Sequence, residues 1–197
     1  KDLKPLEVDL QNFKEALSVS EATDAFMNAA SPGVIAQFQP NQHYPDHSSY
    51  LYALADAMKV EYEGIAEAGL VIQIDSPDLA LGRHVLFKDQ SDEEFVAMAE
   101  LHIEALNHAL QNIPAEQLRL HVCWGNYQGP HHCDIEMKKI LPAVLKAKPM
   151  ALSFEGANPR HSHEWSVFRD AKIPENKVLI PGVLDSTTNF VEHPELV

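Results

Sequence analysis

The chain has 197 residues, of which 45% are hydrophobic and 22% are charged, and its formal net charge is −14. This length suffices for one domain with a hydrophobic core, and the acidic balance argues against nucleic acid as a partner, because phosphate binding needs a basic surface. No apolar run approaches the ~20 residues of a membrane span, and the opening KDLKPLEVDL has no signal-peptide hydrophobic region. We therefore expect neither a nucleic-acid nor a membrane partner.

Strand-like and helix-like segments alternate along the chain. After a polar opening segment, short apolar runs predict strands, and apolar residues at i, i+3 and i+4 spacing predict helices between them. Ser91 with Glu94 forms a capping box at the start of one helix, and Pro142 predicts a kink in another. The predicted strands lie at 25–30, 70–75, 119–123, 151–157 and 178–185, the predicted helices at 46–68, 91–112, 135–147 and 160–170, and a loop at 38–46. This alternation favours an α/β fold with a parallel sheet.

Polar residues stand at the end of nearly every predicted strand. The carboxyl ends of parallel strands meet at one edge of a sheet, so such residues are typical of the active face of a barrel or an open sheet. No phosphate-binding loop of the GxGxxG or GxxxxGKS/T type is present, so a nucleotide-binding fold has no support. The polar strand-end residues are Asn28, Asp75, His121, Cys123, Glu155 and Asp185.

The run RLHVCWGN places His121 and Cys123 two residues apart, so their side chains point to one face near the end of a strand. Imidazole and thiolate are preferred zinc ligands, although the same pair also occurs as a buried histidine beside an inert core cysteine. Glu155 ends the next strand in the apolar context SFEGA, where a carboxylate needs a cation or a hydrogen-bond partner. These three side chains are candidate metal ligands from adjacent strand ends.

The two cysteines, Cys123 and Cys133, could in principle form a disulfide. Their surroundings instead suggest a reducing compartment and another use. We therefore expect a cytoplasmic protein.

Four segments together resemble the catalytic barrel of cobalamin-independent methionine synthase and its shorter single-barrel relatives, which include the epoxyalkane–coenzyme M transferases. The segments are HVCWGN, IQIDSP, FEGANPRHSHEW and PGVLDSTTNFVEHPEL. The resemblance covers nearly the whole chain and implies a single domain over 1–197 that is part of a (β/α)8 TIM barrel. A full barrel has eight strands in about 250 residues, so the five predicted strands indicate a fragment.

The resemblance also implies a function. In that family a zinc ion binds the substrate thiol as thiolate, and the thiolate attacks an electrophilic carbon. This implies Zn²⁺ as cofactor, with His121 and Cys123 as ligands and Glu155 as a third. A further cysteine ligand of the family lies past the end of this chain. The implied partners are a small-molecule thiol and an alkyl or methyl donor, with a folate as one candidate donor. The resemblance leaves the oligomeric state open.

Two departures from the family pattern leave the substrate and the proton donor open. The methionine synthases have a glutamate where this chain has Ser76, and a catalytic histidine just after the strand that matches PGVLD, where this chain continues from Asp185 with STTN. The lead hypothesis is zinc-dependent methyl transfer to a thiol. The alternatives are a zinc-dependent C–S lyase or epoxide–thiol transferase and, in a different class, a non-catalytic barrel relative or inactive fragment.

Other residues are predicted to bind substrate or to act in catalysis. Asp75 matches a family aspartate that contacts the amino group of homocysteine, but it could equally cap the following turn. Asp185 could orient a substrate or pair with an arginine. Arg160 could clamp an anionic group or form a solvated salt bridge. The predicted substrate-binding residues are Asn28, Ser31, Asp75, Ser76, Trp124 and Arg160, and the predicted catalytic residues are Asp75 and Asp185.

Overall fold

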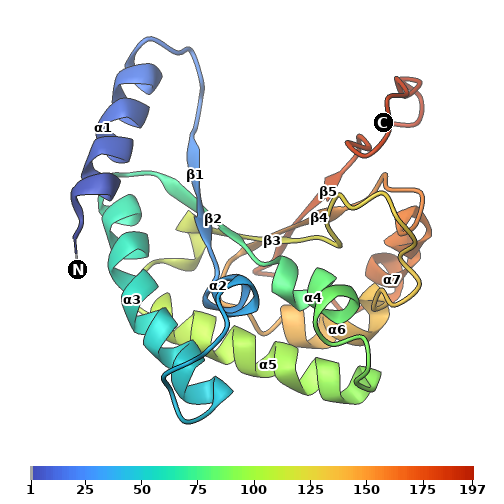
Figure 1. The fold of residues 1–197 in the computed structure, drawn as a ribbon. Coiled ribbons are helices and arrows are strands. Elements are labelled where there is room, and N and C mark those ends of the chain that lie inside the picture. Colours follow the sequence, from blue (N-terminus) through green and yellow to red (C-terminus); the bar gives the residue numbers. More distant parts are fainter. Residues whose placement is uncertain (1) are drawn as a thin grey trace.

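The computed structural model describes residues 2–197 and contains one sheet of five parallel strands in the order β1-β2-β3-β4-β5 (Figure 1). Each strand pairs with the next strand in the sequence, as in a (β/α) barrel, and the α/β fold and the partial TIM barrel are confirmed. Within residues 2–197 the sheet stays open, with β1 and β5 at its edges. The strands are β1 (Phe26–Ala30), β2 (Val71–Asp75), β3 (Leu118–Val122), β4 (Ala151–Glu155) and β5 (Val178–Gly182).

Helices connect the strands, and α2, α3, α5 and α6 pack against one another on one side of the sheet (Figure 1). Short 3-10 turns precede β3 and follow β2 and β4. In residues 2–197, no helix is both long and apolar enough to cross a membrane. The helices are α1 (Lys4–Ser18), α2 (Pro32–Phe38), α3 (His47–Glu67), α4 (Leu81–Val85), α5 (Asp92–Ala109), α6 (Met137–Val144) and α7 (Trp165–Asp170).

The ends of the long helices follow their sequence signals. The Ser91 hydroxyl accepts a bond from the Glu94 amide at 3.2 Å, and the Glu94 carboxylate accepts one from the Ser91 amide at 2.8 Å, so the predicted capping box is present. The Asp46 carboxylate caps α3 by accepting a bond from the Ser49 amide at 2.7 Å. Gly69 follows α3 with φ +83°, a conformation that favours glycine. Local side-chain chemistry therefore sets where these helices begin and end.

Three helices were not predicted: α1 in the polar segment before the first strand, α2 directly after β1 and α4 after β2. Helix α1 has no fully buried residue and packs mainly along α3. Its apolar stripe of Leu6, Leu10, Phe13 and Leu17 contacts the core, so the opening segment does carry a helical pattern. Helices α2 and α4 are only 7 and 5 residues long, too short for a periodic pattern to reveal.

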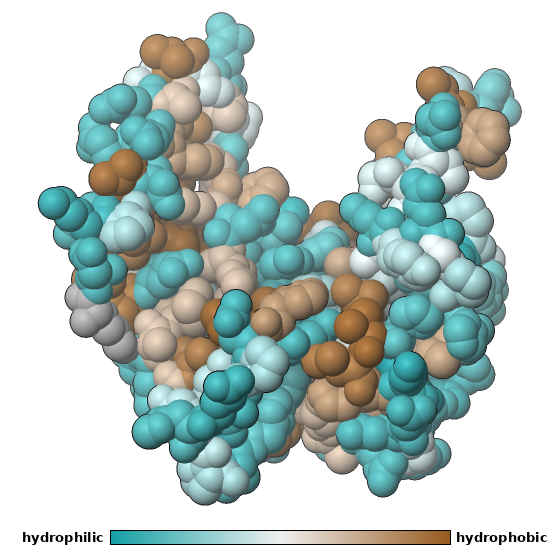
Figure 2. Space-filling view, in the orientation of Figure 1, coloured by the Kyte–Doolittle hydropathy of each residue, from teal (hydrophilic) through white to brown (hydrophobic). Residues whose placement is uncertain are grey.

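Successive side chains of the central strands point alternately to the two faces of the sheet. One set faces the helices and is buried, and each such side chain contributes about 1.5–3 kcal/mol through removal from water. Its members in β2 and β3 are Ile72, Ile74, Leu118, Leu120 and Val122, all at most 1% exposed. The other set, which includes Asp75 and His121, is partly exposed. Figure 2 shows a broad hollow between the N-terminal helical arm and the C-terminal segment.

Candidate functional site

The parallel register places the predicted site residues in neighbouring rows. Asp75 pairs with His121, and His121 pairs with Ser153, so these three lie in one row across β2, β3 and β4. Cys123 lies two residues beyond His121 and therefore points to the same face. Neighbouring strands are about 4.8 Å apart, which lets side chains of one row meet.

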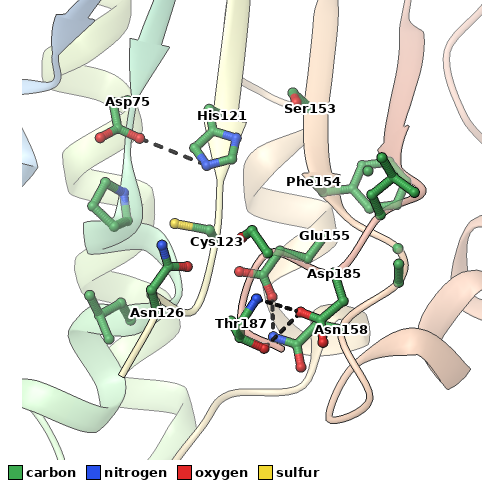
Figure 3. Close-up of a pocket in the computed structure, with 18 residues that line it drawn as sticks. Asp75, His121, Cys123, Asn126, Ser153, Phe154, Glu155, Asn158, Asp185 and Thr187 are labelled. Carbon is green, nitrogen blue, oxygen red and sulfur yellow. Dashed lines mark hydrogen bonds and ion pairs between the residues drawn. The ribbon is translucent and has the colours of Figure 1, made fainter. Parts of the chain in front are cut away.

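Asp75, His121 and Cys123 form the group that we name the ligand cluster. Each offers one ligand atom, and these atoms all lie within 4.8 Å of one another. The His121 Nε2 atom is 3.9 Å from the Asp75 Oδ1 atom, and Figure 3 shows the two side chains facing each other. In the part of the chain that the structure describes, no other three His, Cys, Asp or Glu side chains meet this closely. A carboxylate, an imidazole and a thiol are a donor set that suits zinc.

The ligand cluster lies on the wall of a pocket of about 490 Å³ at the carboxyl ends of the strands. This is where barrel and open-sheet enzymes carry their sites. The polar residues around it include Asn126, Ser153, Glu155, Asn158, Asp185, Ser186 and Thr187 (Figure 3).

The pocket disfavours negative charge on sulfur. Burial raises the pKa of the Cys123 thiol to about 11, and the nearby carboxylates of Asp75 and Glu155 add to this, although a hydrogen bond from the Gly125 amide opposes it. Burial also raises the pKa of the Asp75 carboxyl, against the opposing effect of His121. A bound cation would offset both effects, because it stabilises thiolate and carboxylate together.

Glu155 lies in the same pocket but outside the ligand cluster. Its Oε2 atom accepts a hydrogen bond of 2.7 Å from the Asn158 side-chain amide. Figure 3 shows the Glu155 carboxylate on the side of the pocket near Asn158 and Asp185. The structure therefore brings Asp75 to His121 and Cys123, and the predicted third ligand Glu155 has a hydrogen-bond partner instead. Asn158 was missed by the sequence analysis, although its position three residues after Glu155 was a local signal.

Asp185 also lines the pocket. Its Oδ1 atom accepts bonds from the Thr187 amide at 2.9 Å and the Thr187 hydroxyl at 2.7 Å, and these bonds lower the pKa of the Asp185 carboxyl. Its Oδ2 atom is buried and has no hydrogen-bond partner within residues 2–197. Asp185 is thus charged and held in place at the pocket wall.

The other predicted substrate-binding residues do not line this pocket. Asn28 lies on β1, where its side-chain oxygen accepts a bond from Gln73. Ser31 is 2% exposed and caps α2 through the Val34 amide. Ser76 is 1% exposed, and its amide donates to the His121 carbonyl.

Trp124 and Arg160 are engaged in loop packing. The Trp124 indole is 1% exposed, donates to the Ile135 carbonyl at 2.9 Å and stacks on His161 with ring centroids 3.8 Å apart. The Arg160 guanidinium donates to the carbonyl oxygens of Tyr127 and Gly125, so it ties down the loop after β3 rather than standing free for an anion. Long-range partners that a sequence pattern does not reveal occupy both side chains.

The chain is similar in sequence and in fold to known methionine synthases. It is 30% identical over 154 residues to a methionine synthase of Saccharolobus solfataricus, a match that covers 76% of this chain and 42% of that protein. It is 30% identical over 145 residues to a methionine synthase of Saccharolobus islandicus, covering 71% and 40% respectively. The solved structure of a B12-independent methionine synthase from Shewanella sp. W3-18-1, in complex with selenomethionine, matches with a TM-score of 0.69 and 17% identity over 95% of this chain and 52% of that chain.

The chain belongs to the methionine synthase family. It spans about two fifths of the length of the curated methionine synthases that it matches. No family model matches the chain. The likeness to the Shewanella enzyme supports the fold, and the likeness to the archaeal methionine synthases supports the family.

Proposed function

We propose that this chain carries the metal site of a zinc-dependent enzyme that transfers an alkyl group, in the leading case a methyl group, to a small-molecule thiol. The single domain over 1–197 would supply part of the barrel around that site. The observation that carries the proposal is the convergence of Asp75, His121 and Cys123 at the carboxyl ends of β2 and β3. The methionine synthases of the Saccharolobus species support the reaction class.

The residues present fit a zinc ion. His121 and Cys123 would hold it, with the carboxylate of Asp75 or Glu155 completing the set from this chain. When bound, zinc would lower the pKa of a substrate thiol and keep it nucleophilic near neutral pH, where a free thiol with a pKa near 8.5 is mostly protonated.

The remaining pocket residues would bind and orient the reactants. Asp75 has a half-exposed carboxylate that could accept a bond from the amino group of an amino-acid thiol, if Glu155 serves the metal. Asp185 lines the pocket and, held by Thr187, would orient a donor group of the substrate. A folate or another methyl donor would approach from the open side of the pocket, and the wall of the pocket would limit the access of water.

The test combines metal content with a transfer assay. Purified wild type, Cys123→Ser and, as a matched control, Cys133→Ser are assayed for zinc and for methylation of homocysteine and other small thiols with a folate donor. We expect Cys123→Ser to lose both zinc and transfer, while Cys133→Ser keeps both. Full zinc content and transfer in Cys123→Ser would refute the proposal.

A second candidate, epoxide–thiol transfer or C–S lysis on the same metal, is favoured by one observation. Ser76 is buried at the position where methionine synthases have a glutamate, so a carboxylate for amino-acid recognition is absent beside Asp75. The same assay run with a sulfonate thiol and an epoxide separates the two candidates. Turnover of the epoxide with no methyl transfer to any thiol would favour the second one.

A further inference from the structure

The main-chain carbonyls of the ligand cluster are held by three backbone amides of neighbouring loops. Two of these amides extend the ladder of the sheet beyond the strands, and the third belongs to the first residue of α4. Ser76 and Leu81 belong to the turn that follows β2, and Ser31 follows β1. The bonds run from Ser31 to Asp75 at 3.0 Å, from Ser76 to His121 at 2.9 Å and from Leu81 to Cys123 at 3.3 Å.

A buried polar network joins these donors behind the pocket. The Ser31 hydroxyl donates to the Asp78 Oδ1 atom at 2.7 Å, and the His102 Nδ1 atom donates to the Asp78 Oδ2 atom at 2.8 Å. The His47 and His102 Nε2 atoms lie 2.9 Å apart. Ser31, Asp78 and His102 are 2%, 1% and 4% exposed. A buried carboxylate is tolerated only with such partners, so Asp78 fixes both segments to α5.

Gly33 shows how closely α2 approaches this network. A Cβ atom at Gly33 would lie 2.0 Å from the Asp78 Oδ2 atom and 2.4 Å from the His102 Nδ1 atom. Real Cβ atoms do not approach other atoms this closely, so any larger residue must force the Asp78–His102 pair apart. The pair and the glycine therefore form one packed unit.

We propose that Asp78 and His102 are positioning residues for the ligand cluster. Their bond fixes the turn at 76–81, whose amides donate to the carbonyls of His121 and Cys123. Asp78 also accepts a bond from the Ser31 hydroxyl, and the Ser31 amide donates to the Asp75 carbonyl, so the position of Asp75 depends on Asp78 as well. Neither Asp78 nor His102 lines the pocket, so they act only through the backbone. As a statement about metal ligands, this rests on the proposed function.

Two variants test the proposal on the full chain. Asp78→Asn keeps the shape of the side chain and weakens its bond to His102, while Gly33→Ala displaces the pair without changing a titratable group. His108→Gln, a change on the same helix at a partly exposed residue outside the Asp78 network, is the control. Co²⁺ is the probe, because thiolate-to-cobalt charge-transfer and ligand-field bands report the ligands and their geometry, and Zn²⁺ competition gives affinity.

We expect both test variants to bind zinc about 10–100-fold more weakly, the usual effect of losing a residue that supports a metal ligand. Their cobalt ligand-field bands are expected to shift, while His108→Gln matches wild type in affinity and spectrum. Wild-type affinity and spectra in both variants would overturn the proposal. If Asp78→Asn does not fold, Gly33→Ala decides by the same criteria.

Amide hydrogen exchange on the metal-free protein separates this proposal from the proposed function. We expect the amides of Ser31, Ser76 and Leu81 to exchange at least ~10-fold faster in Asp78→Asn, while the amide of Ile74 in β2 is unchanged. If wild type binds no metal but these amides respond, the proposed function fails and the positioning role stands. Equal exchange in variant and wild type overturns the positioning role.

Discussion

The stability of the protein is expected to depend on the charge of His161, which lies between two carboxylates. Its Nδ1 atom is 3.0 Å from the Glu164 carboxylate, its Nε2 atom is 2.9 Å from the Asp134 carboxylate, and the residue is 6% exposed. Burial lowers the pKa of His161, but the bonds to Asp134 and Glu164 outweigh burial and raise the pKa to about 8. The charged imidazole thus joins the loop after β3 to the loop after β4.

The size of the effect follows from the difference between the folded and unfolded pKa values of His161. The pKa rises from 6.5 to about 8, a difference of about 1.5 units. At about 1.36 kcal/mol per unit, the charged form adds about 2 kcal/mol to the free energy of unfolding. Because the folded pKa is the higher one, this contribution is complete below pH 6.5 and is lost as the pH rises through 8. For a chain of this length the loss corresponds to about 4–8 °C in Tm.

Urea unfolding from pH 6 to pH 9 measures this dependence. We expect the free energy of unfolding of wild type to fall by about 2 kcal/mol more than that of His161→Gln over this range. The stacked Trp124 gives a second readout in a Trp165→Phe background, because protonated imidazole quenches indole emission. If wild type and His161→Gln show the same pH dependence, the reasoning about this charge is refuted.

Three further predictions concern single positions. Metal-free Cys123 should react with iodoacetamide slowly at pH 8 and much faster at pH 10, because its thiol has a pKa of about 11. Peptide mass spectrometry measures the two rates, and equal rates would contradict this prediction. Ser91→Ala should lower the free energy of unfolding by about 1 kcal/mol through loss of the capping box, measured by urea denaturation, and an unchanged value would count against that role. Gly125→Ala should lower the free energy of unfolding more than Gly69→Ala does. Both glycines have φ near +80°, but only a Cβ atom at position 125 would lie 3.0 Å from the Leu81 side chain. Equal urea denaturation midpoints of the two variants would show that this contact is unimportant.

The sequence predicts those parts of the fold that are determined by residues close together in the chain. Strand runs, helical stripes and the Ser91 capping box depend on residues close in the chain, and their positions agree with the structure. The meeting of Asp75 with His121 depends on the register of β2 against β3, which strand order alone does not fix. The shortness of α2 and α4 left no periodic signal, so they could not be predicted in this way.

The details of the site depend on contacts between distant residues. Ser31 and Asp78 are 47 positions apart and Asp78 and His102 are 24 apart, so their network has no local signature. Trp124 is predicted to bind substrate, but its indole is bonded to Ile135 and packed on His161. Such partners decide where a polar or aromatic side chain points, and spacing alone does not reveal them.

The central claim is that the ligand cluster binds zinc, and elemental mass spectrometry on the purified, undenatured chain tests it most directly. After incubation with zinc and removal of the excess, we predict about one zinc ion per chain in wild type and almost none in Cys123→Ser. The absence of zinc from wild type, or an equal zinc content in Cys123→Ser, would contradict the claim.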